Sequence, residues 1–125
     1  MYMHAEKNPI IARALDVLEN DAEVQELLRM SNVMAVARLK YNDHGITHSR
    51  IVAGAALELF DLLLQGEISP TTLRDHTVSS IDEAKLVVFL AAYLHDIGNS
   101  VHRLYHEYIG VLVAKDLLDR LLPVI

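Results

Sequence analysis

The apolar residues of this 125-residue chain recur at steps of three and four positions along nearly its whole length. That spacing places them on one face of an α-helix. Alternating β-branched runs closed by Asn-Gly turns, which are typical of hairpins, do not occur in the sequence. The pattern therefore predicts an all-α protein, a bundle of about five to six helices that forms a single domain over residues 1–125.

Capping and breaking residues divide this pattern into segments. Asn8 followed by Pro9 starts the first helix, and Gly66 ends the longest. The segment between Asp82, its expected cap, and Gly98, its expected stop, is apolar on nearly every side, so it should lie in the middle of the domain. The helices expected from these breaks span residues 9–20, 21–39 with a bend or a new cap at 31–32, 47–64, 70–75, 83–96 and 102–121.

The longest predicted helix should pack closely against another helix. Ile51, Ala55, Leu59 and Leu62 give it an apolar stripe, and Gly54 lies within a run of alanines. Small side chains let two helix backbones approach, so we expect the close contact near Gly54.

Composition narrows the classes of function. The chain has no Cys, which excludes disulfides, thiolate metal ligands and cysteine nucleophiles. Its net charge of -6 argues against a nucleic-acid-binding module, which normally carries a basic patch. The longest strongly apolar run, residues 86–94, is too short to cross a bilayer, and no signal-peptide pattern is present. We therefore expect a cytoplasmic protein that binds neither membrane nor nucleic acid.

The pair His95-Asp96 is the first candidate for chemistry. It closes the most hydrophobic stretch of the chain, LVVFLAAYLHDIG, where an ionised Asp is costly unless it is paired or bound to metal. Neighbouring residues point about 100° apart around a helix axis, so both can bind one ion only where the helix ends. The alternative is that Asp96 simply leaves the core at the helix end and His95 bonds a backbone carbonyl.

Two further His pairs have the spacing i, i+4, which places imidazoles on one face of a helix and occurs in metal sites. His44 precedes Gly45 in a predicted loop, whereas His48 opens the longest helix and is the better single ligand. His102 and His106 follow Asp96, with Arg103 between them. Taken alone, each pair is better explained as solvated polar residues than as a metal site.

Together these residues predict a metal site. They supply imidazoles and a carboxylate without a thiolate, a donor set that suits Mn²⁺, Fe²⁺, Co²⁺, Ni²⁺ or Zn²⁺ better than Ca²⁺. A bound divalent ion would polarise a phosphoryl group and activate a water, and it would give an acidic protein the positive charge that a phosphate needs.

The stretches YNDHGITHSRIVAGAALEL and FLAAYLHDIGNSVHRLYHEYIGVLVAKDLL resemble the motif regions of the HD superfamily of metal-dependent phosphohydrolases, and within it an uncharacterised prokaryotic or archaeal branch. The resemblance runs from about Tyr41 to Asp119 and implies an HD-domain-like helical bundle. It implies hydrolysis of a nucleotide or another small phosphate ester by metal-activated water.

The resemblance also assigns roles. His48, His95 and Asp96 correspond to the metal ligands, and Asp96 would orient the attacking water. His106 corresponds to a residue that binds a second metal or the substrate phosphate, and Arg103 would assist it. The catalytic residues implied are thus Asp96, His106 and Arg103, with His102 and His44 as further candidates for a second metal or phosphate.

The family's ligand set ends with an Asp on a later helix, and Asp116 and Asp119 lie too early to match it. We therefore expect a domain that lacks its C-terminal helices. The alternative function is a helical binding or dimerisation module with a vestigial metal site, a homo-oligomer formed through the apolar end LLDRLLPVI. A purely structural bundle would require all three His clusters to be accidental.

Overall fold

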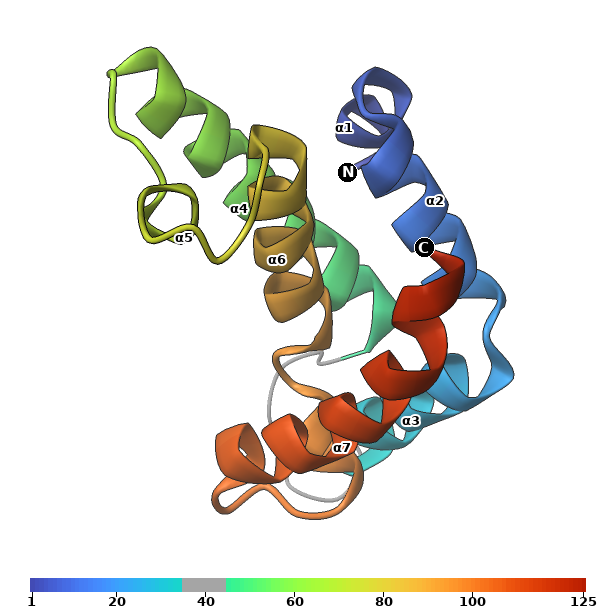
Figure 1. Cartoon of the computed structure of the whole chain (residues 1–125). Coiled ribbons are helices and arrows are strands. Elements are labelled where there is room, and N and C mark those ends of the chain that lie inside the picture. The colour runs from blue at the N-terminus through green and yellow to red at the C-terminus, as the bar shows by residue number, and fades with distance from the viewer. Residues whose placement is uncertain (35–44) are drawn as a thin grey trace.

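The computed structural model describes residues 1–34 and 45–125. Every regular element in these ranges is helical, which confirms the all-α prediction (Figure 1). None of the described helices is long and apolar enough to cross a membrane. The elements are α1 (Tyr2–Lys7), α2 (Pro9–Asn20), α3 (Ala22–Asn32), α4 (Ile46–Gln65), α5 (Thr71–Arg74), α6 (Ile81–Leu94), the 3-10 turn η2 (Ile97–Ser100), α7 (His106–Leu121) and the 3-10 turn η3 (Leu122–Val124).

Helix α6 lies at the centre of the bundle, as its all-round apolar character predicts. Phe89 and Tyr93 are completely buried in a core that also receives side chains from α2, α3, α4 and α7. The helix starts earlier than predicted, because the hydroxyl of Ser80 caps it by accepting a hydrogen bond from the backbone N–H of Glu83 at 3.1 Å. Asp82 instead accepts a hydrogen bond from the side chain of Asn8.

Helix α4 packs along α6, and its bounds agree with the prediction within one residue. The face that it buries is different: Ser49, Ala53 and Leu57 are buried, whereas the predicted stripe at Ile51, Leu59 and Leu62 is exposed. The close contact at Gly54 is with the N-terminal residue and not, as the sequence predicted, with another helix: an added Cβ at Gly54 would come within 3.0 Å of the backbone nitrogen of Met1.

The chain between α6 and α7 differs from the prediction in two ways. Helix α6 ends at Leu94 rather than at Asp96, and α7 begins at His106 rather than at His102. Tyr105 precedes α7 with a left-handed φ of 59°, which a continuous helix does not allow. Residues 101–105 therefore form a turn that carries α7 back against η2.

Gly98 makes this return possible. A Cβ atom at Gly98 would overlap the carbonyl oxygen of His106 and come within 2.6 Å of the backbone nitrogen of Gly110. The backbone of η2 thus touches the first turns of α7 directly. The role of Gly98 is close contact between two backbones, not the termination of α6 that the sequence predicted.

Candidate metal centre

His95 and Asp96 lie where the α-helical backbone of α6 gives way to the 3-10 turn η2. His95 is still near helical geometry at φ -59° and ψ -30°, whereas Asp96 has φ -101° and ψ 6°. This change turns the two side chains toward the same space, as the prediction for the end of a helix required. The Asp96 carboxylate is only 6% exposed, while the His95 ring is 37% exposed at the mouth of the site.

Three imidazole rings face the Asp96 carboxylate, each with its Nε2 atom. His48, from the first turn of α4, lies 3.2 Å from Oδ2, and His95 lies 3.0 Å from the same oxygen. His106, from the first turn of α7, lies 3.2 Å from Oδ1. The fold therefore brings together four side chains from three segments that are distant in the sequence.

The hydrogen-bond partners of the ring nitrogens assign the tautomers of two of these histidines. His95 donates from Nδ1 to the carbonyl oxygen of Ala92 at 2.7 Å. The Nδ1 of His106 faces the carbonyl oxygen of Arg103 and Oε2 of Glu107, each at 3.0 Å. When neutral, both rings thus present a lone pair on Nε2 toward Asp96, which is how metal-binding histidines are usually held.

This arrangement requires a hydrogen atom or a metal ion between the rings and the carboxylate. The Nε2 atoms of His48 and His95 are 3.4 Å apart and both face Oδ2 of Asp96, so without either one their lone pairs would oppose one another. A proton is one solution: the hydrogen bond to Asp96 raises the pKa of His95, against the opposing effect of partial burial.

A metal ion is the other solution, and the donor set fits it. Ligand atoms of His48, His95 and Asp96 all lie within 4.8 Å of one another. Two imidazole nitrogens and one carboxylate oxygen are suitable ligands for a divalent transition metal. The second carboxylate oxygen faces His106, so one Asp links the ligand group to α7.

Arg103 lies at the edge of this cluster. Its Nη1 atom is 3.4 Å from Nε2 of His106 and donates to Oδ1 of Asn99 at the same distance. Asn99, which was not singled out as a candidate from the sequence, follows Gly98 and is completely buried in η2. Its Nδ2 has no hydrogen-bond partner among the described residues, and its oxygen orients the guanidinium of Arg103. The signal available in the sequence was an Asn three positions after Asp96, whereas its burial is known only from the structure.

Two other candidates from the sequence, His102 and His44, are not found in this cluster. The ring of His102 is exposed and accepts a hydrogen bond from the backbone N–H of Leu104 at 2.9 Å, so no described contact joins it to Asp96. His44 falls within residues 35–44, which are outside the described ranges.

The chain was compared with known proteins. The family model described as HD domain matches residues 45–124, which include every member of the cluster. The uncharacterized protein MJ1020 of Methanocaldococcus jannaschii is 42% identical over 107 residues. The matched part is 86% of this chain and 41% of that protein, so this chain spans less than half the length of the relative. No solved structure matches the chain.

Proposed function

Because this chain belongs to the HD domain family, we propose that it is a metal-dependent phosphohydrolase domain that acts on a nucleotide or another small phosphate ester. One observation carries the proposal. The buried carboxylate of Asp96 faces three imidazole nitrogens at 3.0 to 3.2 Å, with an arginine at the edge of the group.

His48, His95 and Asp96 would hold a divalent transition metal ion. When bound, such an ion polarises a phosphoryl oxygen and lowers the pKa of a water molecule. Asp96 would also accept a hydrogen bond from the attacking water and so orient its lone pair toward phosphorus. Since Asp96 contacts both the α4 and the α7 histidines, its position is fixed from two sides.

Arg103 and His106 would bind the phosphate. A guanidinium donates two parallel hydrogen bonds to phosphate oxygens, and Asn99 already holds this one beside His106. Together with the ion, these side chains would supply the positive charge that a chain of net charge -6 otherwise lacks. His102 and His44 stay candidates for further phosphate or metal contacts, and a cytoplasmic location stays a prediction.

A hydrolysis screen tests this function. Purified chain is assayed on a phosphomonoester and a phosphodiester of p-nitrophenol with Mn²⁺, Fe²⁺, Co²⁺, Ni²⁺ or Zn²⁺ in turn. We expect turnover with at least one ion, and its loss in Asp96→Ala. Asp61→Ala is the matched control, because Asp61 also contacts a histidine but lies outside the cluster. Turnover that is no higher than that of the free ion, or equal turnover in Asp96→Ala, would contradict the proposal.

The alternative, a binding or dimerisation module with a vestigial metal site, is favoured by a separate observation. An apolar groove opens beside the cluster, and it is described below. A chain that binds metal and self-associates but hydrolyses neither ester would support this alternative instead.

A further inference from the structure

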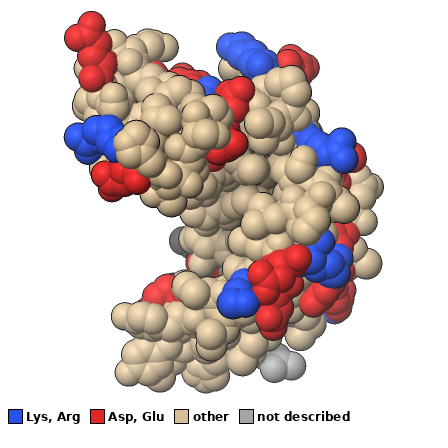
Figure 2. All heavy atoms as spheres, viewed as in Figure 1, with Lys and Arg blue, Asp and Glu red and all other residues tan. Residues whose placement is uncertain are grey.

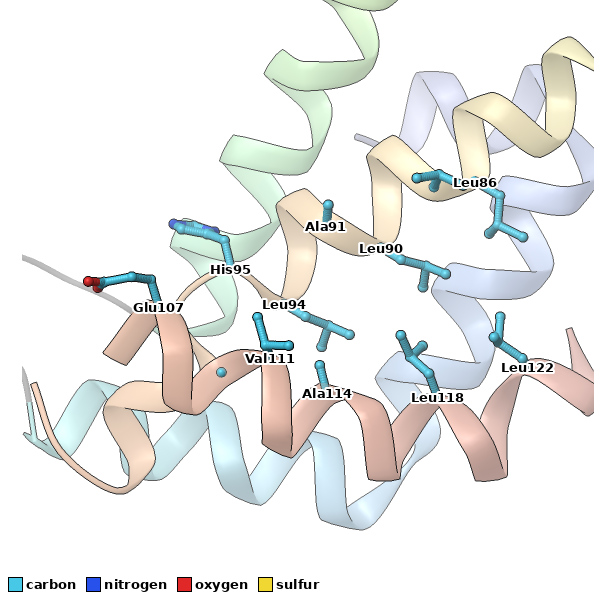
Figure 3. A pocket seen from close by; sticks show the side chains of 12 residues that line it. Leu86, Leu90, Ala91, Leu94, His95, Glu107, Val111, Ala114, Leu118 and Leu122 are labelled. Carbon is cyan, nitrogen blue, oxygen red and sulfur yellow. The ribbon is translucent and has the colours of Figure 1, made fainter. Parts of the chain in front are cut away.

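An open groove of about 490 Å³ runs between α6 and α7. Its walls are aliphatic on both sides, and at one end it reaches His95 and Glu107 (Figure 3). In the space-filling view a deep notch crosses this face of the molecule, and uncharged residues form most of its walls (Figure 2). The lining side chains include Leu86, Leu90, Leu94, Val111, Ala114 and Leu118.

Apolar side chains that line the groove also face solvent: Val111 of α7 is 67% exposed, and Val87 of α6 and Leu122 are about half exposed. Tyr108 and Leu112, which lie on α7 but outside the lining, are each about two-thirds exposed. Apolar surface on this scale, next to a preformed groove, is typical of an interaction site.

We propose that a second copy of this chain fills the groove, in a symmetric dimer in which α7 of each copy lies antiparallel in the α6–α7 groove of the other. Each copy would supply both the ridge and the groove, as an interface with two-fold symmetry requires. The two α7 helices would cross at Val111, which is 67% exposed on the rim.

The sequence of α7 is complementary to itself in this register. When two antiparallel helices cross at Val111, each residue before it faces the residue equally far after it. Tyr108 then faces Ala114 of the partner, a large side chain against a small one. Glu107 faces Lys115 of the partner, which are opposite charges. Both charged side chains extend into solvent, at 60% and 70% exposure, and their present contacts are with the neighbouring His106 and Asp119.

Light scattering coupled to size exclusion, followed by sedimentation equilibrium, measures the association. We expect the purified chain to be a dimer, and Val111→Glu to weaken dimerisation by about 100-fold, because two facing carboxylates would be buried in an apolar contact. Leu59→Glu is the matched control: it is a leucine on α4 that is 61% exposed and lies outside the groove. It should leave the dimer unchanged.

A charge exchange tests the register itself. Glu107→Lys should weaken the dimer by about fivefold, since rim ion pairs contribute little each but occur twice by symmetry. Adding Lys115→Glu should restore the original affinity. Circular dichroism melting of each variant separates a lost interface from a lost fold.

Three outcomes would overturn this proposal. The first is a wild-type chain that stays monomeric at about 100 µM, because a specific dimer should form at that concentration. The groove would then bind something else, such as a helix of a longer polypeptide. A dimer that dissociates in Leu59→Glu but not in Val111→Glu would place the interface on α4. A folded dimer that is unaffected by either substitution would exclude both surfaces.

Discussion

Two clusters of histidine and carboxylate can be compared within residues 1–34 and 45–125, and of these two only one has the geometry of a metal site. In the first, His4 lies 3.3 Å from Glu58 and 3.7 Å from Asp61, and Lys85 contacts Asp61 at 2.6 Å. In the second, the carboxylate of Asp96 lies among three imidazoles. Both clusters combine histidine with carboxylates. The first has one imidazole beside two carboxylates, whereas the second has one carboxylate beside three imidazoles.

The two clusters differ in how the negative charge of their carboxylates is compensated. At His4 the acids are 58% and 31% exposed, and a lysine already compensates one of them. At Asp96 the carboxylate is nearly buried, and the Nε2 atoms of three imidazoles face it at 3.0 to 3.2 Å. Only in the second cluster do ring nitrogens converge on a buried carboxylate, an arrangement that a bound proton or a divalent ion would stabilise. Convergence of donor atoms on a buried charge, not the count of ligand residues, marks the site.

The largest effect should come from neutralising one carboxylate in each cluster. Asp96→Asn removes a charged ligand and should lower Mn²⁺ affinity by at least about 100-fold. Asp61→Asn should change it by less than about twofold, because surface ion pairs of this kind contribute little to a distant site. Isothermal titration calorimetry measures both. Equal losses in the two variants would mean that the clusters do not differ as their geometry indicates.

A backbone change should disturb the second cluster while the first stays intact. Gly98→Ala places a methyl group against the carbonyl of His106, so α7 must move and carry His106 away from Asp96. We expect a loss of about 1–3 kcal/mol in the free energy of unfolding by urea, together with weaker metal binding.

Gly66→Ala is the control for that change. An added Cβ there would meet carbonyl oxygens of α4 at ordinary contact distances of 3.5 and 3.6 Å, and the backbone φ of -80° suits alanine. Its stability should equal that of the wild type or exceed it by up to about 1 kcal/mol. If both alanines destabilised the protein equally, the close contact at Gly98 would not be its specific role.

The smallest effect is on pH dependence. Since Asp96 raises the pKa of His95, the protonated ring stabilises the metal-free fold below pH 6.5, and this contribution is lost as the pH rises through the higher folded-state value. Because the ring is 37% exposed, we expect only about a few tenths of a kcal/mol. Metal affinity should change in the opposite direction and fall by up to about tenfold per pH unit on acidification. In His95→Gln, stability and metal affinity should both depend less on pH. If neither pH dependence changes, another titrating group causes it.

The helical periodicity was sufficient to predict the main helices and the position of His95-Asp96 at a helix end. It did not predict α1, because none of its six residues is fully buried and they carry no apolar pattern. It also extended α7 through residues 102–105, because nothing in the sequence marks the left-handed backbone at Tyr105. A local sequence pattern predicts which side chains lie on an apolar helix face, but it does not predict every point at which the backbone changes direction.

The candidate site was predicted residue by residue but not as an arrangement. Spacing grouped His102 with His106, yet the turn at 101–105 separates them, and only His106 faces Asp96. His4 lacked any partner in the local sequence, whereas its acids lie more than 50 residues away in α4. These pairings depend on how α4 and α7 pack, which no short window of sequence contains.

The position of His95 has one more consequence. Its ring belongs both to the Asp96 cluster and to the end of the α6–α7 groove. Any ligand that fills the groove and any ion that binds the cluster therefore act on one shared side chain. By thermodynamic reciprocity, the factor by which the ion changes affinity for the groove ligand equals the factor by which that ligand changes affinity for the ion. Measuring either binding reaction with and without the other ligand would give the same coupling free energy.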